Sequence, residues 1–511
     1  MGKIKIMLVL EGTYPYCDGG VSTWAHTLCN RVDNADFTLY AITANYHTKS
    51  KYTLPQSVKH VIQVPLWSPD EPGDYTGEGV NYATTVSKKN RTTARIVSLR
   101  FVPLLEELLT HIYSDNHDPD RLDRVFIEMW HYFKLFDFKE TMLEQQVWNT
   151  YREFVCTMGV RKGEPEPKLI ELTTGMRWLY RLLTPLSVPV PKVDVVHLTM
   201  SGFALLPALI ASYKYNTPIV LTEHGVFIRE RLLAINSSGY SFFLKKFLIC
   251  FSESIARLAY HKADIILSVN QFNKKWELQY GAAPEKLRVA YNGIDHTLFK
   301  PRPKPEHLRH TPTVVALARI FELKDIITMI RSCAVVKRKI PNVQFLVYGD
   351  KTSVPEYTAE CEALIKELGL QNNFTLKGTR NCPQELFCEG DLSILTSVSE
   401  GFPYTILESM SCGIPVVATD VGGTAEALNH QVSGFICKPR DPEDIGNRVV
   451  QLLTDTHLRE EMSRNARKRI IENFTMANFI ETYERVYHEV HYKPQPVMPQ
   501  HDLSLKKYAA G

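Results

Sequence analysis

Short apolar runs alternate with stretches of mixed polarity in the N-terminal half of the chain. The runs that we assign to strands are residues 3–10, 193–197, 218–221 and 263–268. The patterns that we assign to helices are residues 21–28, 204–213 and 242–259. Strands that are apolar throughout and are separated by helices are typical of a parallel sheet covered on both faces. We therefore predict a doubly wound sheet in this half.

The same alternation begins again in the C-terminal half. The predicted strands there are residues 313–318, 343–348, 374–377, 392–396 and 414–419, and later helices are residues 445–454 and 459–473. The proline-rich stretch at 300–312 fits a linker between domains. We place an N-terminal domain at 1–297 and a C-terminal domain at 298–476.

Residues 65–191 depart from this alternation. Aromatic-rich helical patterns at 101–113 and 125–154 dominate the segment, and we predict a helical insertion in the N-terminal domain. The predicted helix at 242–259 has two interpretations, because apolar residues lie near Lys245 and Lys246. It either packs in the core or contacts a membrane surface.

Composition limits the classes of protein that the chain can be. Its 511 residues suit two domains, and 44% hydrophobic residues, 23% charged residues and a net charge of +3 exclude a disordered chain and a strongly basic nucleic-acid binder. The ten cysteines include no Cys-x2-Cys pair, so we expect reduced thiols rather than zinc ligands or disulfides. The N-terminus shows no signal-peptide pattern, and we expect a cytoplasmic protein.

Two glutamates in the stretch 396–423 define the candidate chemistry. Glu400 lies in a loop, and Glu408 lies about two turns into the helix that follows, so the two carboxylates are about 10–12 Å apart at 1.5 Å per residue. Carboxylates that flank one glycosidic bond are about 5–9.5 Å apart. This pair instead suits the two ends of an elongated ligand. The helix start near Tyr404, Thr405 and Ile406 presents amides that suit a diphosphate.

Two further stretches have residues of types that can bind phosphate. Arg319 follows the predicted strand 313–318, and Lys324 lies five residues later, so two cations meet at the end of a strand. Gly19 and Gly20 separate the first strand from the first helix, where a glycine loop lets the backbone approach an anion. For Gly19 and Gly20 the alternative is a tight turn, and for Arg319 and Lys324 it is a solvated loop.

These stretches resemble glycosyltransferase family 4, whose members are retaining enzymes with the GT-B fold. SEGFP with GIPVVATDVGG resembles the C-terminal signature of the family, and LARIFELKD resembles its diphosphate-binding residues. EGTYPYCDGGVSTW and LTEHGVFIRER are similar to the PelF-like group, which makes Pel polysaccharide. The resemblance implies two Rossmann-like domains facing a cleft, and a C-terminal segment at 477–511 whose helix returns to the N-terminal domain.

The resemblance also implies residue roles. Glu400 would contact the transferred sugar, Glu408 the ribose, and Arg319 with Lys324 the leaving diphosphate. For His197 a catalytic role and a packing role both stay open, since many members of the family have their histidine at the position of Thr199. The expected donor-binding residues are Gly19, Gly20, His224, Asn292, Arg319, Lys324, Glu400, Gly401, Phe402, Tyr404, Thr405, Ile406 and Glu408.

The implied reaction moves a hexose from UDP-glucose or a UDP-N-acetylhexosamine to a glycan or lipid-linked acceptor in exopolysaccharide synthesis. No cofactor and no metal are expected, because Asp118 and Asp120 form an Asp-x-Asp only within a charged surface turn. The expected partners are the nucleotide sugar, the acceptor and a membrane-bound synthase complex at the inner face of the membrane, without nucleic acid. The alternatives are a nucleotide-sugar epimerase and a non-catalytic subunit that binds sugar nucleotides.

Overall fold

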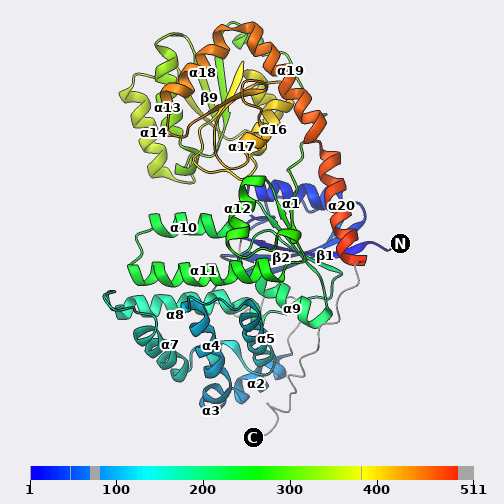
Figure 1. The fold of residues 1–511 in the computed structure, drawn as a ribbon, viewed down its shortest axis with the longest axis vertical. Helices are drawn as coiled ribbons and strands as arrows, with labels where there is room; N and C mark the ends of the chain where they lie inside the picture. The colour runs from blue at the N-terminus through cyan, green and yellow to red at the C-terminus, as the bar shows by residue number, and fades with distance from the viewer. Residues whose placement is uncertain (1, 47, 69–80, 381, 493–511) are drawn as a thin grey trace. The chain divides into compact units, whose positions relative to one another are not determined.

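The computed structural model describes residues 2–46, 48–68, 81–380 and 382–492. The chain forms two compact units (Figure 1). Unit 1 comprises Met1–Leu267, Trp276–Arg288 and Tyr483–Gly511, and unit 2 comprises Ser268–Lys275 and Val289–Thr482. Residues 69–80 of the predicted insertion and 493–511 of the predicted C-terminal segment lie outside the described residues.

Unit 1 contains a sheet with the strand order β3-β2-β1-β4-β5-β6-β7. The strands are β1 (Ile4–Glu11), β2 (Ala35–Thr43), β3 (Val58–Pro65), β4 (Val195–Leu198), β5 (Ile219–Glu223), β6 (Ile265–Ser268) and β7 (Leu287–Val289). The pairings from β3 to β5 are parallel, and the apolar centre of β1, from Ile6 to Leu10, is fully buried. This confirms the predicted doubly wound sheet. The helices that follow its strands are α1 (Gly20–Arg31), α9 (Leu205–Tyr215), α10 (Phe227–Ser237), α11 (Phe242–Lys262) and α12 (Gln271–Gln279).

The segment between β3 and β4 is helical in its described part. Its elements are α2 (Tyr82–Arg91), α3 (Ala94–Ile96), the π-helix η2 (Val97–Phe101), α4 (Val102–Tyr113), α5 (Pro119–Leu135), α6 (Phe138–Met142), α7 (Gln145–Thr157), α8 (Leu169–Leu183) and the 3-10 helix η3 (Thr184–Ser187). Helices α4, α5 and α8 pack on α11 (Figure 1). Ion pairs of Lys246 with Glu164 (2.5 Å) and of Lys262 with Asp123 (2.7 Å) join α11 to this segment.

Helix α11 belongs to the core of unit 1. Phe243, Phe247 and Phe251 are buried there among the apolar residues of the insertion. The structure therefore accounts for this apolar face by core packing, the first of the two interpretations. Within the described ranges, no helix combines the length and the apolar character that a membrane span requires.

Unit 2 contains the second sheet, with the strand order β10-β9-β8-β11-β12-β13 and parallel pairings. The strands are β8 (Thr313–Leu317), β9 (Gln344–Tyr348), β10 (Phe374–Gly378), β11 (Leu392–Leu395), β12 (Val416–Thr419) and β13 (Gly434–Cys437). The α-helices are α13 (Ile326–Lys337), α14 (Pro355–Glu367), α15 (Pro383–Leu386), α16 (Tyr404–Ser411), α17 (Thr424–Ala427), α18 (Pro442–Thr454), α19 (Thr456–Asn473) and the first part of α20 (Met476–Tyr492), which enters unit 1 at Tyr483. The short 3-10 turns are η5 (Glu306–Leu308), η6 (Glu322–Lys324) and η7 (Phe387–Glu389), while η4 (Pro284–Lys286) belongs to unit 1.

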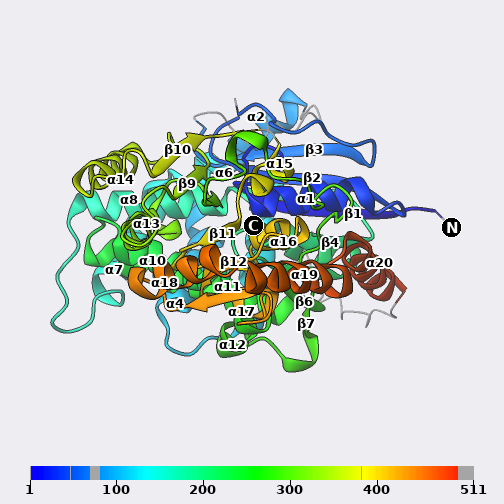
Figure 2. The ribbon, with the colours of Figure 1, turned by 90° about the horizontal axis from the view of Figure 1, so that it is seen from above.

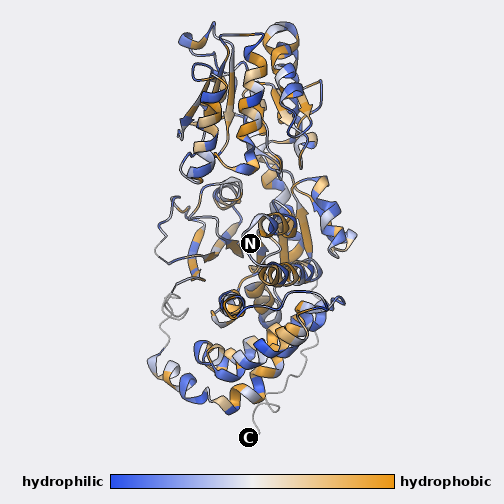
Figure 3. Cartoon of the chain, turned by 90° about the vertical axis from the view of Figure 1, so that its left-hand side faces the viewer, coloured by the Kyte–Doolittle hydropathy of each residue, from blue (hydrophilic) through white to orange (hydrophobic). Residues whose placement is uncertain are grey.

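The layers of unit 2 follow the polarity of its elements. Helices α13 and α18 lie side by side (Figure 2). The strands are mainly apolar, whereas the helices carry both apolar and polar residues (Figure 3). A sheet buried on both faces needs apolar strands, and each covering helix needs only one apolar face. Strand order reverses between β8 and β11, and in open α/β sheets ligands bind at the carboxyl ends of strands at such a point.

The chain passes between the two units at positions that differ from the expected boundary at 297. Residues 289–297 belong to unit 2 because Ala290 N–H donates to Ser268 O (2.9 Å) and Ile294 N–H donates to Phe474 O (2.9 Å). From Tyr483 onward the chain belongs to unit 1, where Trp24 Nε1 donates to the Tyr483 hydroxyl (3.1 Å). Hydrogen bonds between residues far apart in sequence do not change the local pattern of polar and apolar residues, so this pattern could not predict these positions.

Candidate functional site

Two loops at the strand-order reversal of unit 2 are bonded to each other. Val398 N–H donates to Leu323 O (2.9 Å), and the Thr396 hydroxyl lies 3.0 Å from the carbonyl oxygens of both Lys324 and Asp325. The first loop follows β8 and the second follows β11. These bonds hold Lys324 beside the loop that contains Glu400.

Lys324 and Glu400 form an ion pair in this position. Lys324 Nζ donates to Glu400 Oε1, and the Ser397 hydroxyl donates to the same oxygen at 2.5 Å. The two side chains are only 21% and 10% exposed, so solvent screens their attraction less than it screens a surface pair. Sequence reasoning selected both residues. It missed their pairing and missed Ser397, because neither follows from the spacing of a motif.

Buried side chains hold the backbone of residues 400–403 in place by hydrogen bonds and ring contacts. Asn270 Nδ2 donates to Gly401 O (2.9 Å), and Asn292 Nδ2 donates to Phe402 O (2.9 Å). The Phe402 ring packs against the rings of Tyr291 and Phe474, with centroids 5.0 and 5.3 Å away. The side chains of Asn292 and Phe402, both expected to bind the donor, thus also support this loop.

Ile406, whose backbone amide was expected at an anion site, lies in the first turn of α16. Its side chain is 1% exposed, and its amide donates to Pro403 O (3.2 Å). The spacing of the motif placed it at the helix start, which is correct, but the side chain points into the core of unit 2. Its contribution to the site is to hold α16 in place.

Gly422 lies directly against this loop. Its φ angle is +54°, and a Cβ atom there would lie 1.8 Å from the carbonyl oxygen of Glu400. The neighbouring Gly423 donates its N–H to Gly401 O (2.8 Å). The position therefore requires glycine for two reasons, its left-handed backbone and the close approach. Sequence reasoning included this Gly-Gly pair in the signature without assigning it a role.

Helix α16 presents a start that is suited to an anion. Pro403 is its N-cap, no side chain caps the first turn, and the first turn contains no acidic residue. Tyr404 and Thr405, both predicted to bind the donor, begin the helix. The positive end of the helix dipole favours a negative group there.

Glu408 is an unusual buried acid about one turn into α16. The predicted two turns are wrong, because the helix begins only at Tyr404. The Oε2 atom of Glu408 is inaccessible to solvent and has no hydrogen-bond partner among the described residues. Burial raises the pKa of this carboxyl from 4.5 to about 7. A buried acceptor without a donor costs about 1–3 kcal/mol, and a hydroxyl group of a ligand would satisfy it.

Arg319 follows β8 at an exposed position. Its guanidinium carbon lies 4.9 Å from the centre of the Phe321 ring, a contact that orients the side chain without neutralising its charge. Arg319 and Lys324 thus both follow the same strand, as their spacing predicted. The planar guanidinium group is suited to two oxygens of a phosphate.

The other predicted residues lie in unit 1. Gly19 has a φ angle of 152°, where glycine is favoured, and precedes Gly20, the first residue of α1. His224 stacks edge-on against Trp24 with ring centres 4.5 Å apart, and burial lowers its pKa to about 3. Its Nε2 atom is buried without a partner among the described residues.

His197 is fully buried in unit 1. Its Nδ1 atom lies 2.7 Å from the Tyr487 hydroxyl, and its Nε2 atom lies 2.7 Å from the Thr222 hydroxyl. Burial, together with the nearby His224, lowers its pKa to about 3, so the ring is neutral. Both ring nitrogens are occupied by protein groups, and these contacts match the packing role that the sequence left open.

No group of three or more potential metal ligands occurs among the residues that the structure describes. Asp118 is the N-cap of α5 and accepts from Arg121 N–H (3.0 Å), while Asp120 lies 3.0 Å from His261 Nε2. The Asp-x-Asp pair therefore begins a surface helix.

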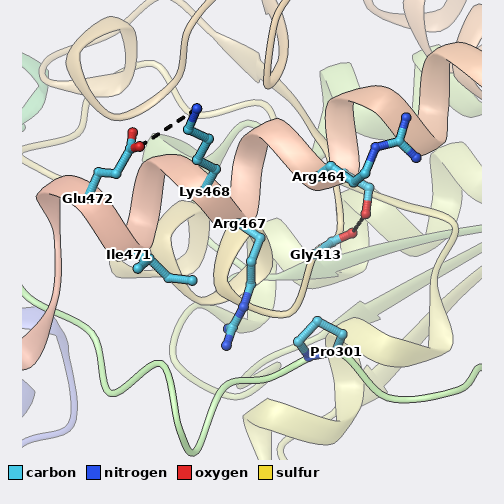
Figure 4. A pocket seen from close by; sticks show the side chains of 8 residues that line it. Pro301, Gly413, Arg464, Arg467, Lys468, Ile471 and Glu472 are labelled. Atoms are coloured by element: carbon cyan, nitrogen blue, oxygen red, sulfur yellow. Dashed lines mark hydrogen bonds and ion pairs between the residues drawn. The ribbon is translucent and has the colours of Figure 1, made fainter.

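A pocket of about 440 Å³ lies beside α19, away from these residues (Figure 4). Arg464 and Lys468 border it, and Arg467 donates to Phe299 O (2.8 Å) and His296 O (3.0 Å). Gly413, also in its lining, follows the C-terminal end of α16. The pocket is therefore at the opposite end of this helix from Glu400.

Comparison with solved structures identifies the fold. The chain is similar to Anabaena HepE in complex with UDP, with a TM-score of 0.58, 17% identity, and coverage of 94% of this chain and 99% of that chain. It is also similar to the sucrose-phosphate synthase of Thermosynechococcus elongatus, with a TM-score of 0.59, 14% identity, and coverage of 95% and 98%. With its two parallel, doubly wound sheets, the chain has the GT-B fold, as the sequence predicted.

Family models match both halves of the chain. Residues 4–285 match the domain of unknown function DUF3492, and residues 300–469 match glycosyl transferases group 1. The first match covers more than half of the chain, which therefore belongs to the DUF3492 family.

The alignments with curated relatives cover less of this chain than the alignments with solved structures do. The N-acetyl-alpha-D-glucosaminyl L-malate synthase of Bacillus anthracis is 25% identical over 247 residues, which are 47% of this chain and 63% of that protein. The sulfoquinovosyl transferase of Arabidopsis thaliana is 27% identical over 289 residues, which are 54% of this chain and 53% of that protein. The chain thus spans between half and two-thirds of the length of these two relatives.

Proposed function

We propose that this protein is a retaining glycosyltransferase of family 4 that transfers a hexose from a UDP-sugar to a glycan or lipid-linked acceptor. The observation that carries the proposal is the arrangement in unit 2 of the Lys324–Glu400 pair, the uncapped start of α16 and the unpartnered carboxyl oxygen of Glu408. Lys324 of the pair is a cation, the start of α16 can bind an anion, and Glu408 can accept a hydrogen bond from a hydroxyl group. A nucleoside diphosphate sugar contains phosphates and a ribose that match them.

Each residue has a role that follows from its chemistry. Departure of the nucleoside diphosphate leaves negative charge on the phosphate, which Arg319, Lys324 and the amides of α16 stabilise. Glu400, held by Ser397 and Lys324, orients the transferred sugar. Glu408 accepts hydrogen bonds from the ribose hydroxyls.

The comparisons support the donor class and leave the acceptor to the proposal. One related solved structure is HepE with UDP and glucose, and its chain is 16% identical to this one. The name of a relative from Campylobacter jejuni, 26% identical over 299 residues, includes a diphospho-undecaprenol acceptor. We extend these to a UDP-hexose and a lipid-linked or glycan acceptor in exopolysaccharide synthesis of the PelF-like kind. The proposed setting is cytoplasmic, beside a membrane-bound synthase.

The direct test is incubation of the full chain with a panel of nucleotide sugars and acceptors. Products are scored separately for transfer, hydrolysis and epimerisation, and the anomeric configuration of the transferred sugar is determined by NMR. Transfer with retained configuration supports the proposal. Epimerised free nucleotide sugar, or nucleotide binding without any turnover, would replace it with one of the two alternatives.

Glu408→Gln will stabilise the fold and weaken nucleotide binding. The folded pKa of about 7 lies above the ordinary 4.5, so the stability that the proton supplies is full below pH 4.5 and is lost as pH rises to 7. Glutamine does not ionise and so avoids this loss. Above pH 7 the free energy of unfolding in urea should be roughly 3 kcal/mol higher for the variant than for the wild type, at 1.36 kcal/mol per pKa unit. UDP affinity, by calorimetry, should fall about fivefold to tenfold because a neutral group replaces a charged acceptor.

Glu472→Gln is the matched control for that prediction. Glu472 lies on the exposed side of α19, 3.8 Å from Lys468, and is outside the proposed donor site. It should change neither readout. Equal UDP affinity of Glu408→Gln and wild type would remove Glu408 from the ribose site, and an equal pH dependence of their stability would contradict the burial argument.

Turnover will persist in EDTA. Arg319 and Lys324 supply positive charge beside the proposed diphosphate position, which is the electrostatic role that a divalent ion has in other transferases. The measurement is the initial rate with EDTA, compared with the rate in magnesium or manganese. Loss of turnover that either metal restores would contradict the proposed mechanism.

A further inference from the structure

Two buried thiols lie side by side at the C-terminal end of α16. Cys412 is the C-cap residue of this helix, and Cys388 belongs to η7. Their sulfur atoms lie 3.8 and 3.6 Å from the same oxygen, the carbonyl of Gln384, to which both thiols donate. The side chains are 2% and 4% exposed, and both thiols are free. Distant parts of the sequence thus form a dithiol.

The surroundings distinguish the two sulfurs. Interaction with Cys412, together with the backbone and the charge of Arg302, lowers the pKa of Cys388. Interaction with Cys388, together with burial, raises the pKa of Cys412. The thiolate is the reactive form of cysteine, and cationic neighbours favour it. Cys388 is therefore the nucleophile of the pair.

A second pocket gives access to this thiol. It has a volume of about 190 Å³, and its lining includes Cys388, Arg302, Lys304 and Arg459. Gly413 and Ser463 line both this pocket and the larger one in Figure 4. Asp391 and Glu460 also line the smaller pocket, and Asp391 pairs with Lys304 at 2.7 Å, so the lining is of mixed charge. A small oxidant can approach Cys388 through this pocket.

We propose that Cys388 and Cys412 are a redox modification site, at which a hydroperoxide oxidises the two thiols to a disulfide. The Cys388 thiolate attacks one peroxide oxygen, the O–O bond breaks, and the leaving oxygen takes a proton to become an alcohol, or water when the oxidant is hydrogen peroxide. Cys388 is then a sulfenic acid. The Cys412 sulfur attacks it, loses its proton, and the hydroxyl group leaves as water. Two electrons have passed from the thiols to the peroxide.

The new bond acts on the proposed donor site through α16. Cys412 N–H donates to Glu408 O (3.0 Å), so the thiol and the proposed ribose-binding residue belong to the same last turns of the helix. A disulfide needs sulfur atoms about 2.05 Å apart, whereas these two thiols are unbonded groups that share one carbonyl acceptor. Formation of the disulfide must therefore shift η7 or the end of α16. This consequence for binding rests on the proposed function, whereas the modification itself does not.

The test of the modification is disulfide mapping. The full-length protein is treated with hydrogen peroxide, the remaining thiols are alkylated, and the peptides are analysed by mass spectrometry. A peptide pair linked through Cys388 and Cys412, absent after reduction, is the expected result. The exposed Cys17 and Cys156 serve as internal controls, since they should be oxidised without joining this pair. Absence of the linked pair while these controls are oxidised overturns the proposal.

The test of the consequence is UDP affinity before and after oxidation. We expect a loss of about tenfold or more, by analogy with the cost of a small misplacement in a site, and full recovery with a thiol reductant. Cys388→Ser and Cys412→Ser should each bind UDP in the reduced state and show no effect of peroxide. An oxidised protein that binds UDP as before overturns the regulatory consequence. Failure of the reduced protein to bind UDP instead contradicts the proposed function and leaves the mapping result intact.

Discussion

Lys324→Ala will lower turnover by about 100-fold or more while it weakens donor binding much less. The lysine is held beside Glu400 by bonds between the loops after β8 and β11, so its charge is in place before the reaction. A preorganised group that stabilises developing charge contributes about 2.7–4 kcal/mol to the barrier. Its effect is larger in the transition state than in the ground state, and therefore appears in kcat.

The Lys324–Glu400 contact makes a double-mutant cycle informative. Lys324→Ala also leaves Glu400 partly buried without its cation, and Glu400→Gln leaves Lys324 without its anion. Residues in contact depart from additivity by about 0.5–3 kcal/mol. We therefore expect the double variant to lose less activity than the sum of the two single losses. Steady-state kinetics and urea unfolding on all four proteins separate activity from stability.

Lys468→Ala is the matched control for this cycle. Lys468 is exposed on α19, has a weak pair with Glu472 at 3.8 Å, and lies at the other end of α16 from the donor residues. Its removal should leave turnover unchanged. A Lys324→Ala protein with a raised KM and an unchanged kcat would show uniform binding, and would contradict the leaving-group role.

Gly422→Ala will abolish most donor binding. The added Cβ atom would lie 1.8 Å from the Glu400 carbonyl oxygen, a distance at which the loop must move. The carbonyl belongs to the residue that we place on the transferred sugar, so the side chain of Glu400 moves with it. A displacement of about 1 Å in a site costs about 100-fold, and we expect UDP affinity or turnover to fall by that order.

Gly413→Ala separates the clash from the backbone effect. Gly413 also has a positive φ, +74°, but an added Cβ atom would meet Pro301 and Ser463 only at 3.4 Å. Alanine in the left-handed backbone region lowers the folding stability of this variant by about 1–2 kcal/mol. The added methyl group makes no contact with the Glu400 loop. The variant should lose stability and keep affinity. Equal affinities of the two variants would contradict the claim that Gly422 positions Glu400.

Local sequence determined many of the strands and helices, although not β2, β3, β7 and β13, and it determined the candidate residues. Strands buried on both faces must be apolar almost throughout, so β1, β8 and β12 are visible as runs without any knowledge of their neighbours. Glu400 and Glu408 are likewise placed by a loop and a helix that lie within one short stretch. The spacing of Arg319 and Lys324 correctly placed both after the same strand.

Tertiary structure decided which of these side chains meet. The pairing of Lys324 with Glu400, the support of Phe402 by Asn292, and the burial of His197 between Tyr487 and Thr222 all join residues that are far apart in sequence. Hydropathy reports whether a residue is buried, but not which partner occupies the space beside it. The pKa of Glu408 and the need for glycine at position 422 depend on such partners, because desolvation and steric exclusion act through space rather than along the chain.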